Sequence, residues 1–422
     1  MNKSVALHTL GCKLNFSETT SMGRMLEKEG FIKKDFQDIA DLYVINTCSV
    51  TENADKECRQ LVRRIQKKAP DAMVVITGCY AQLKPKEIAA IPGVNLVLGA
   101  AEKFNIAEHL KELSKNDSGK ICSCEIEDVN IFTPSHSINE RTRIFLKVQD
   151  GCDYNCSFCT IPMARGKSRS DSVSNVLSNI EAIAAGGAKE IVLTGINLGD
   201  FGKGISGGKK KEENFFDLIK GIESDSPIER VRISSIEPNL LSNEIIEFIS
   251  TSKKFMPHFH IPLQSGSNIT LSNMRRRYKR ELYAEKVSLI KNLIPDACIG
   301  ADVIVGFPGE TNEDFNETAD FISALKISYL HVFTYSERDN THALTIKPVI
   351  PVNIRNERNS ILRNISYAKM QSFTEQHIGQ KRKVLFESVN KNGMMEGYSD
   401  NYIKITTPHK EEWENEIIEW TI

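Results

Sequence analysis

Long apolar segments are missing from this chain of 422 residues. No apolar run approaches the roughly 18 residues that a membrane-spanning helix needs. The first residues also lack the apolar core of a secretory signal. We therefore expect a cytoplasmic protein with no membrane partner. Thiols stay reduced in that compartment, so the ten cysteines favour metal ligation over disulfide bonds.

An excess of either charge is missing too, with 54 Lys and Arg against 55 Asp and Glu. The formal net charge of -1 excludes binding to nucleic acid through overall charge, so any such binding must come from local basic patches. Hydrophobic residues make up 40% of the chain, which is typical of a globular protein. The length predicts about three domains.

Three cysteines, Cys152, Cys156 and Cys159, form a C-x3-C-x2-C run. They follow the apolar segment 144–148, an expected strand, so they should lie on a loop at its carboxyl end. Cubane iron–sulfur clusters are held by cysteine sulfur, and three thiolates leave one iron open. Structural zinc needs four protein ligands, and no fourth Cys or His lies nearby. The run therefore predicts a 4Fe–4S cluster with one open iron.

A second cysteine set is expected in the first hundred residues. Short apolar runs predict strands at 5–9, 42–46, 73–77 and 96–98. Amphipathic stretches predict helices at 16–29, 54–68 and 84–90. This alternation indicates a doubly wound parallel sheet. Cys12, Cys48 and Cys79 follow the first three strands, and the carboxyl ends of parallel strands form the binding crevice. We expect these thiols to converge on a second cluster; the alternative is three independent core cysteines.

Beyond a polar linker at 113–141, strand–helix alternation resumes. Strands are expected at 144–148, 190–193, 230–234, 258–261, 301–305 and 329–333. Amphipathic segments that separate these strands predict helices, for example at 176–185, 281–293 and 313–325. Six βα units are too few for a closed eight-stranded barrel and predict a partial (β/α)6 barrel, with active residues on the carboxyl-end loops. From residue 380 the pattern changes to short strands at 383–387, 395–398 and 402–405.

The cysteine run after the first strand of a partial barrel resembles the radical S-adenosylmethionine (SAM) enzymes. The amino-terminal segment Thr9-Leu10-Gly11-Cys12-Lys13-Leu14-Asn15 narrows the resemblance to the methylthiotransferase family, together with the tripeptides that end at Cys48 and Cys79. The sequence Cys-Lys-Leu-Asn at residues 12–15 is similar to that of the MtaB branch of the family. The resemblance covers nearly the whole chain.

The resemblance implies two 4Fe–4S clusters and SAM as cofactors. It implies conversion of N6-threonylcarbamoyladenosine, beside the anticodon of tRNA, to its 2-methylthio derivative. One SAM is the methyl donor and a second is the source of a 5′-deoxyadenosyl radical. The implied partners are the tRNA anticodon stem-loop and an electron donor such as flavodoxin or ferredoxin. Two alternatives stay open: the same chemistry on isopentenyl-adenosine tRNA or a ribosomal protein, and a zinc-bearing, non-catalytic RNA-binding protein.

The resemblance also implies site residues. The six cysteines are the cluster ligands and catalytic residues. Leu193-Thr194-Gly195-Ile196-Asn197 takes the place of a Gly-Gly-Glu motif, so groups other than a glutamate must hold the SAM ammonium. SAM contacts are expected from Tyr154, Phe158, Arg165, Thr194, Gly195, Asn197, Ser235, Glu237, Gln264, Ser265 and Gly306. The alternative for the turn residues is a plain βα turn without ligand contact.

RNA contacts are expected in two places. The segment 274–280 packs five basic residues around Tyr278, a composition that neutralises phosphate and stacks bases. The carboxyl-terminal strands resemble a TRAM domain, a small RNA-binding β-barrel. Its expected contacts are Lys381, Arg382, Lys383, Tyr398 and Tyr402. The expected domains are therefore a methylthiotransferase domain at 1–125, a radical SAM barrel at 126–372 and a TRAM-like domain at 373–422.

Overall fold

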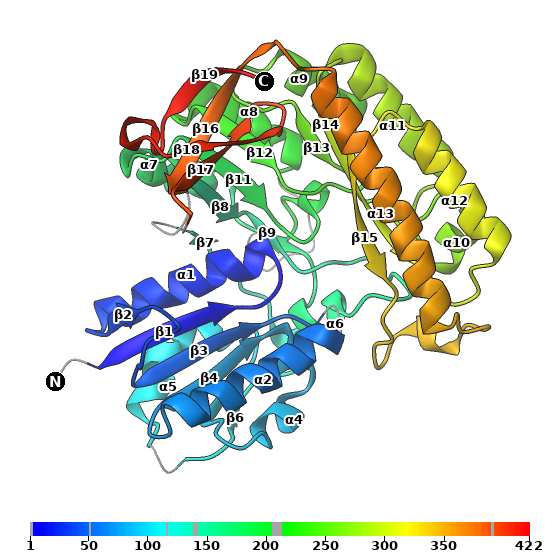
Figure 1. The fold of residues 1–422 in the computed structure, drawn as a ribbon. Coiled ribbons are helices and arrows are strands. Elements are labelled where there is room, and N and C mark those ends of the chain that lie inside the picture. Colours follow the sequence, from blue (N-terminus) through cyan, green and yellow to red (C-terminus); the bar gives the residue numbers. More distant parts are fainter. Residues whose placement is uncertain (1–2, 50–51, 115–116, 138–141, 205–212, 390–391) are drawn as a thin grey trace.

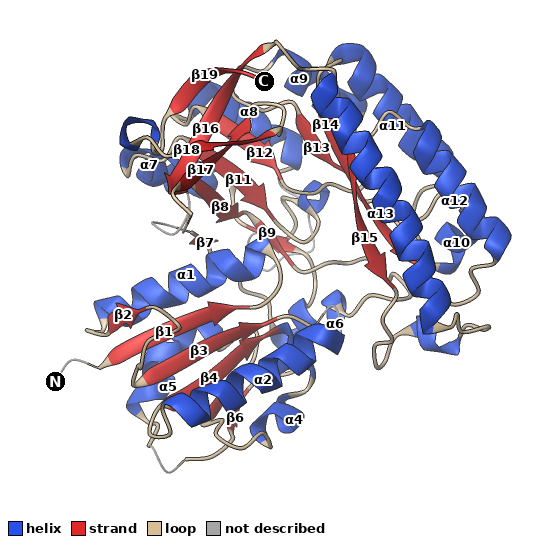
Figure 2. Ribbon diagram, viewed as in Figure 1, coloured by secondary structure: helices blue, strands red, loops and turns tan. Residues whose placement is uncertain are grey.

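The computed structural model describes residues 3–49, 52–114, 117–137, 142–204, 213–389 and 392–422. An amino-terminal α/β domain, a partial barrel and a carboxyl-terminal sheet follow one another along the chain (Figure 1). The carboxyl-terminal sheet lies beside barrel strands β8, β11 and β12, on the side away from the amino-terminal domain (Figure 2). None of the described helices combines the length and apolar character that crossing a bilayer would need.

The amino-terminal domain is a six-stranded parallel sheet in the order β2-β1-β3-β4-β5-β6. Its strands are β1 (Ser4–Thr9), β2 (Ile32–Lys34), β3 (Leu42–Thr47), β4 (Met73–Gly78), β5 (Leu96–Leu98) and β6 (Lys120–Cys122). Its helices are α1 (Lys13–Lys28), α2 (Glu52–Lys68), α3 (Cys79–Leu83), α4 (Pro85–Ala89) and α5 (Ile106–Lys111). Alternate strand residues pack on α1 and α5 on one face, and on α2, α3 and α4 on the other. The predicted doubly wound sheet is confirmed, with β2 and β6 as unforeseen edge strands.

The middle of the chain forms six parallel strands in sequence order, as predicted. They are β8 (Arg143–Lys147), β11 (Glu190–Thr194), β12 (Arg230–Ile233), β13 (His258–His260), β14 (Cys298–Val305) and β15 (Tyr329–Thr334). A single parallel bridge, Val231 to Phe255, connects the two halves of this sheet. Three short strands border it, β7 (Ser135–His136), β9 (Gln149–Asp150) and β10 (Arg169–Ser170).

Helices cover the outside of the barrel and share one apolar core with its strands. They are α7 (Val173–Ala185), α8 (Phe215–Asp225), α9 (Asn243–Thr251), α11 (Arg280–Leu293), α12 (Asn312–Ala324) and α13 (Val352–Glu375). Side-chain caps fix their starts: Asn214 and Thr311 form capping boxes, and Ser172 and Ser242 cap α7 and α9. Two short helices lie at the carboxyl ends of the strands, α6 (Ile161–Arg165) and α10 (Asn268–Asn273).

The carboxyl-terminal sheet is antiparallel, in the order β18-β17-β16-β19. Its strands are β16 (Lys381–Val389), β17 (Met394–Ser399), β18 (Lys404–Pro408) and β19 (Ile417–Thr421). The strand β19 was not predicted; it pairs with β16 over its whole length. A small apolar core of Val384, Phe386 and Met395 fits a small barrel.

Three of the expected RNA contacts in this sheet also contact the barrel. Tyr402 stacks on His258 of β13 at 4.0 Å between ring centroids, and Arg143 of β8 lies 4.2 Å from the centre of the Tyr398 ring. Arg382 forms an ion pair with Asp296, which follows α11. These half-buried side chains attach the sheet to the barrel, a role that the sequence did not indicate, and their contact with RNA stays a prediction. Lys381 and Lys383 are exposed.

Candidate functional site

The first three cysteines lie at the carboxyl ends of neighbouring strands. Residues 46 and 47 of β3 pair with Thr77 and Gly78 of β4, and Thr9 of β1 pairs with Asn46. Cys48 and Cys79 are therefore adjacent in register, and Cys12 occupies the N-cap position of α1, shortly after β1 ends at Thr9. Burial raises the pKa of the Cys79 thiol, with Arg165 opposing the shift and Cys12 adding to it. The predicted convergence of the three positions is thus present in the structure.

Glycines before two of these cysteines allow the strand ends to come close. Gly11 has a φ of 98°, and a Cβ there would lie 2.8 Å from Cys48 Sγ. Gly78 has a φ of 96°, and its Cβ would lie 2.3 Å from the Thr47 carbonyl oxygen. Only glycine tolerates both the positive φ and this spacing. The Gly-Cys pairs are therefore a steric requirement of the site.

The second set, Cys152, Cys156 and Cys159, lies on the loop between β9 and α6. Each sulfur accepts one N–H donor: from Tyr154 N at 3.3 Å, from the Arg276 guanidinium at 3.1 Å and from Ile161 N at 3.4 Å, respectively. Burial raises the pKa of Cys152 and Cys159 to about 12. N–H donors aimed at sulfur suit the thiolates that hold an iron–sulfur cluster.

The two cysteine sets face each other across the domain interface. Helix α3, which begins at Cys79, packs against α6 of the second cysteine loop. Thr160, next to Cys159, reaches the carbonyl oxygen of Ser49, next to Cys48, at 3.5 Å. The strands β1 and β3 point toward α6 (Figure 1). A single interface therefore carries both sets.

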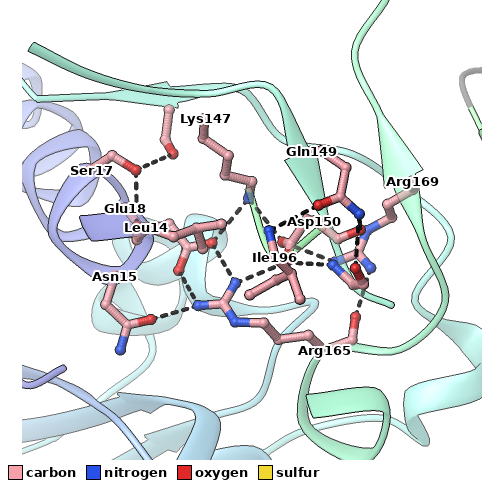
Figure 3. Close-up of polar contacts among 12 residues, drawn as sticks. Leu14, Asn15, Ser17, Glu18, Lys147, Gln149, Asp150, Arg165, Arg169 and Ile196 are labelled. Atoms are coloured by element: carbon pink, nitrogen blue, oxygen red, sulfur yellow. Dashed lines mark hydrogen bonds and ion pairs between the residues drawn. The ribbon is translucent and has the colours of Figure 1, made fainter. Parts of the chain in front are cut away.

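A buried ion network fixes this interface (Figure 3). Glu18 of α1 contacts Lys103 at 2.6 Å, Lys147 of β8 at 2.9 Å and Arg165 of α6 at 3.2 Å. Asp150 contacts Lys147, Arg165 and Arg169 at 3.0, 2.9 and 3.2 Å. Burial alone would raise the pKa of Glu18, but its cationic partners hold that pKa below the usual range.

The network holds four cations against two carboxylates, so positive charge is in excess. The excess lies beside sulfur, because Cys79 and Cys12 both raise the pKa of Arg165. Uncompensated buried charge is costly, and anionic thiolate ligands would offset it. This charge balance fits a metal cluster at Cys12, Cys48 and Cys79.

A cavity lies between the second cysteine loop and the ends of β14 and β15. Its lining is Phe158, Cys159, Thr160, Ile161, Gln264, Asp302, Ile304, Phe333, Thr334, Tyr335 and Ser336. Apolar walls with a few polar groups are typical of sites for small organic ligands. The structure thus brings the predicted residues Phe158 and Gln264 together beside Cys159. Gln264 has a φ of 66°, a strained conformation for a non-glycine residue that often marks a functional site.

Two further predicted residues carry buried polar atoms without a protein partner. Within the described residues, Thr194 Oγ1 and Asn197 Oδ1 have no hydrogen-bond partner. Their turn is held by Gln149, whose Oε1 accepts N–H bonds from Ile196 and Asn197, each at 2.8 Å. Gly195 lies against the same side chain, since a Cβ there would be 2.9 Å from Gln149 Oε1. Unpartnered buried oxygens are rare and suit a ligand ammonium.

Beside the second cysteine set, Arg276 forms an ion pair with Glu237 and also donates to Cys156 Sγ. The Tyr154 hydroxyl accepts a hydrogen bond from Asn239 at 2.7 Å. The guanidinium of Arg277 lies over the Tyr154 ring, 3.9 Å from the ring centre. Glu237 and half-buried Ser235 therefore lie at the end of β12, near the cysteine loop. In the segment expected to bind RNA, buried Tyr278 instead donates to the carbonyl oxygens of residues 262 and 263. The aromatic residue of that segment therefore points into the protein and not toward solvent.

Three expected SAM contacts are directed elsewhere. The Nη1 and Nη2 groups of Arg165 bind Glu18, Asp150 and Asn15, whereas its buried Nε has no hydrogen-bond partner among the described residues. Ser265 Oγ lies 3.1 Å from Thr318 Oγ1 of α12. Gly306 lies against Arg355 of α13, where a Cβ would be 2.3 Å from Arg355 Cγ. Each of these residues has a protein contact that supports the site, and direct SAM contact by them stays a prediction.

The comparisons with known proteins bear on this geometry. Residues 4–99 match the model described as uncharacterized protein family UPF0004, and residues 146–322 match the radical SAM superfamily. The Bacillus subtilis protein named threonylcarbamoyladenosine tRNA methylthiotransferase MtaB is 38% identical, over 98% of this chain and 92% of its own. A Clostridium botulinum tRNA-2-methylthio-N(6)-dimethylallyladenosine synthase is 31% identical, over 92% and 86%.

The chain belongs to the radical SAM methylthiotransferases, in the MtaB branch. The radical SAM methyltransferase TsrM from Kitasatospora setae, solved with tryptophan and a SAM analogue, superposes with a TM-score of 0.56 at 16% identity. That match covers 78% of this methylthiotransferase and 73% of TsrM, and it shows a shared fold.

Methylthiotransferases of this type use SAM and two 4Fe–4S clusters. The donor set in this chain fits them, since two cysteine trios lie at one interface with N–H donors and surplus positive charge beside sulfur. The residues that sequence analysis missed are the interface charges Glu18, Lys147 and Asp150, and the turn support Gln149. In the sequence, these residues are marked only by being polar at positions of a strand or helix face that is otherwise apolar.

Proposed function

We propose that this methylthiotransferase converts N6-threonylcarbamoyladenosine in tRNA to 2-methylthio-N6-threonylcarbamoyladenosine. The observation that carries the proposal is the 38% identity to the Bacillus subtilis MtaB over nearly the full length of both chains, with both cysteine trios in place. The dimethylallyladenosine enzyme is less similar, at 31%. Dimethylallyl-bearing tRNA is therefore the second candidate substrate.

We assign Cys12, Cys48 and Cys79 to the auxiliary cluster, and Cys152, Cys156 and Cys159 to the SAM-binding cluster. When bound, the clusters and SAM supply a transferable methylthio group and a radical that activates adenine C2. Thr194 and Asn197 would accept hydrogen bonds from the SAM ammonium, because their oxygens lack other partners. Phe158 and Gln264 would hold its adenosine against the apolar cavity wall. Glu237, Tyr154 and Ser235 would complete this side of the site.

The protein's own charges set the relation between the two cluster sites. The network of Glu18, Asp150 and Arg165 locks α1 to α6, so the separation between the trios is fixed before substrate binds. A fixed separation orients the adenine for reaction at C2, the kind of positioning that enzymes use to lower barriers.

The remaining assignments concern partners and domains. The tRNA anticodon stem-loop would lie across the interface, with Lys381 and Lys383 of the carboxyl-terminal sheet as exposed basic contacts. An electron donor such as flavodoxin or ferredoxin would supply the reducing electron, and the tRNA substrate places the enzyme in the cytoplasm. We keep the domain division 1–125, 126–372 and 373–422.

The test uses the full chain purified without oxygen and loaded with iron and sulfide. Anticodon stem-loops bearing threonylcarbamoyladenosine or dimethylallyladenosine are incubated with SAM and a reductant, digested and analysed by mass spectrometry. The proposal expects a methylthio product from the first loop alone. A product from the second loop alone would transfer the assignment to the second candidate.

A further inference from the structure

Lys13 places a cation beside the first cysteine set, at the interface with the barrel. It directly follows Cys12 and begins α1. Its Nζ reaches across the domain interface to 6.0 Å from the centre of the Phe145 ring, on barrel strand β8. The charged barrel residues near enough to act on it are Arg143 of β8, Arg232 of β12 and Asp302 of β14. Lys13 thus lies in the space enclosed by the amino-terminal domain and the barrel, and it remains exposed to solvent.

The other cations around this space already have partners. Lys147 and Arg165 bind Glu18 and Asp150. Two more pairs lie beside the carboxyl-terminal sheet: Arg143 with Glu387 at 2.9 Å, and Arg232 with Glu190 at 2.8 Å.

For Lys13 itself, no hydrogen bond or ion pair connects it to any part of the chain that the structure describes. Because the Lys13 side chain is exposed, an anionic group that enters from solvent can reach its ammonium.

Asp302 faces the same space and acts on Lys13 through space, but the two side chains form no ion pair. Its Oδ1 lies 2.9 Å from His260 Nε2 and 3.4 Å from His331 Nδ1. Asp302 also lines the cavity beside Cys159. Lys13 therefore lies beside Cys12, and the His–Asp–His cluster borders the cavity that Cys159 lines. A base that both cysteine sets reach would place its N6 substituent in this region.

The two candidate substrates differ in that substituent. The threonylcarbamoyl group ends in a carboxylate and a hydroxyl, whereas the dimethylallyl group is purely apolar. A lone ammonium would stabilise the first and would be left unpaired by the second. We propose that Lys13 binds the threonine carboxylate of the substrate and thereby selects threonylcarbamoyladenosine. This inference rests on the proposed function and identifies the residue that sets substrate choice.

The test compares Lys13→Gln with wild type and with Lys28→Gln, an exposed lysine at the other end of the same helix. Two stem-loops are used: one bears threonylcarbamoyladenosine, the other the threoninol analogue in which the carboxylate is a hydroxymethyl group. Iron content, the Kd for each loop without SAM, and kcat/KM are measured for all three proteins.

Loss of a charge-assisted hydrogen bond should weaken the Kd and lower the kcat/KM of Lys13→Gln for the carboxylate loop by about ten- to hundredfold. The threoninol loop should be unaffected, and iron content and the Lys28→Gln control should match wild type. Equal losses on both loops, or a loss of iron, would overturn the inference and assign Lys13 to the auxiliary cluster. No loss on either loop would overturn it too. A wild type inactive on the carboxylate loop would instead contradict the proposed function.

Discussion

Glu18 of the amino-terminal domain and Arg165 of the barrel are joined by two hydrogen bonds of 3.2 Å, with the side chains 0% and 3% exposed. The pair ties the helix that follows Cys12 to the helix that follows Cys159. Residues of both domains surround each cysteine set. The arrangement of the two sets therefore depends on this buried charge pairing as well as on the cysteines.

Replacing Glu18 by Gln should destabilise the protein strongly. The substitution leaves Lys103, Lys147 and Arg165 with less negative charge in a buried site, and breaking such pairs costs about 3–5 kcal/mol. Urea unfolding under anaerobic conditions measures the loss. Glu29→Gln is the matched control: Glu29 lies at the end of the same helix, exposed, with one ion pair of 3.6 Å, and should lose less than about 0.5 kcal/mol. Similar losses for both variants would contradict a structural role for the network.

The contribution of Glu18 should also depend on pH in a defined direction. Its pKa in the folded protein lies below the ordinary value of 4.5, and the pKa of Asp150 is lowered as well. Burial alone would raise both pKa values, but the attraction of several neighbouring cations outweighs it. The unfolded chain binds more protons as the pH falls through this ordinary value, so the stabilisation is complete above it and is lost below it. The stability difference between wild type and Glu18→Gln should narrow when the pH is lowered from 6 toward 3. A difference that widens would contradict the lowered pKa.

The cysteine sets should separate two activities. Cys156→Ala should abolish SAM cleavage, whereas Cys48→Ala should retain SAM cleavage and lose methylthiolation. Each variant should retain about four of about eight iron atoms per chain, since each cubane holds four. Chromatography of 5′-deoxyadenosine and mass spectrometry of the digested RNA provide the readouts. Cys58→Ala is the control, because Cys58 is buried in the core of the amino-terminal domain and should keep all the iron. Methylthiolation by Cys48→Ala would contradict a second cluster.

Domain docking and RNA binding should be separable in the carboxyl-terminal sheet. Arg232 donates to the carbonyl oxygens of Ser399 and Asp400 at 2.7 and 2.9 Å, so Arg232→Met should loosen the sheet and speed proteolysis at its junction with α13. Lys383→Ala should leave proteolysis unchanged, weaken RNA binding and reduce the magnitude of the salt slope of binding by about 1. Salt titration of RNA affinity tests this. An unchanged slope for Lys383→Ala would place the RNA contact elsewhere.

The strands and the cysteine positions were predictable because both depend on local pattern. Strands of a parallel sheet are apolar on both faces, and the cysteines that end them follow within a few residues. Helix α13 was missed because its buried positions include Arg355 and Arg358, which suggest a solvent-exposed stretch. Tyr402 was assigned to RNA because, in sequence alone, an aromatic residue near basic residues cannot be told apart at an RNA-binding surface and at a domain interface.

Arg165 shows the other limit of sequence analysis. Its position directly after the cysteine loop suggested a SAM contact, but its partners Glu18 and Asp150 lie 147 and 15 positions away along the chain. Such long-range charge pairing has no local signature. Packing against Gly306 is equally invisible, because it depends on where α13 crosses the barrel.

The most direct measurement is the nucleoside composition of tRNA from cells with and without this gene. Loss of the gene should abolish 2-methylthio-N6-threonylcarbamoyladenosine and increase N6-threonylcarbamoyladenosine, and a plasmid copy of the gene should restore the original ratio. Unchanged 2-methylthio-N6-threonylcarbamoyladenosine in the deletion strain would contradict the assigned substrate.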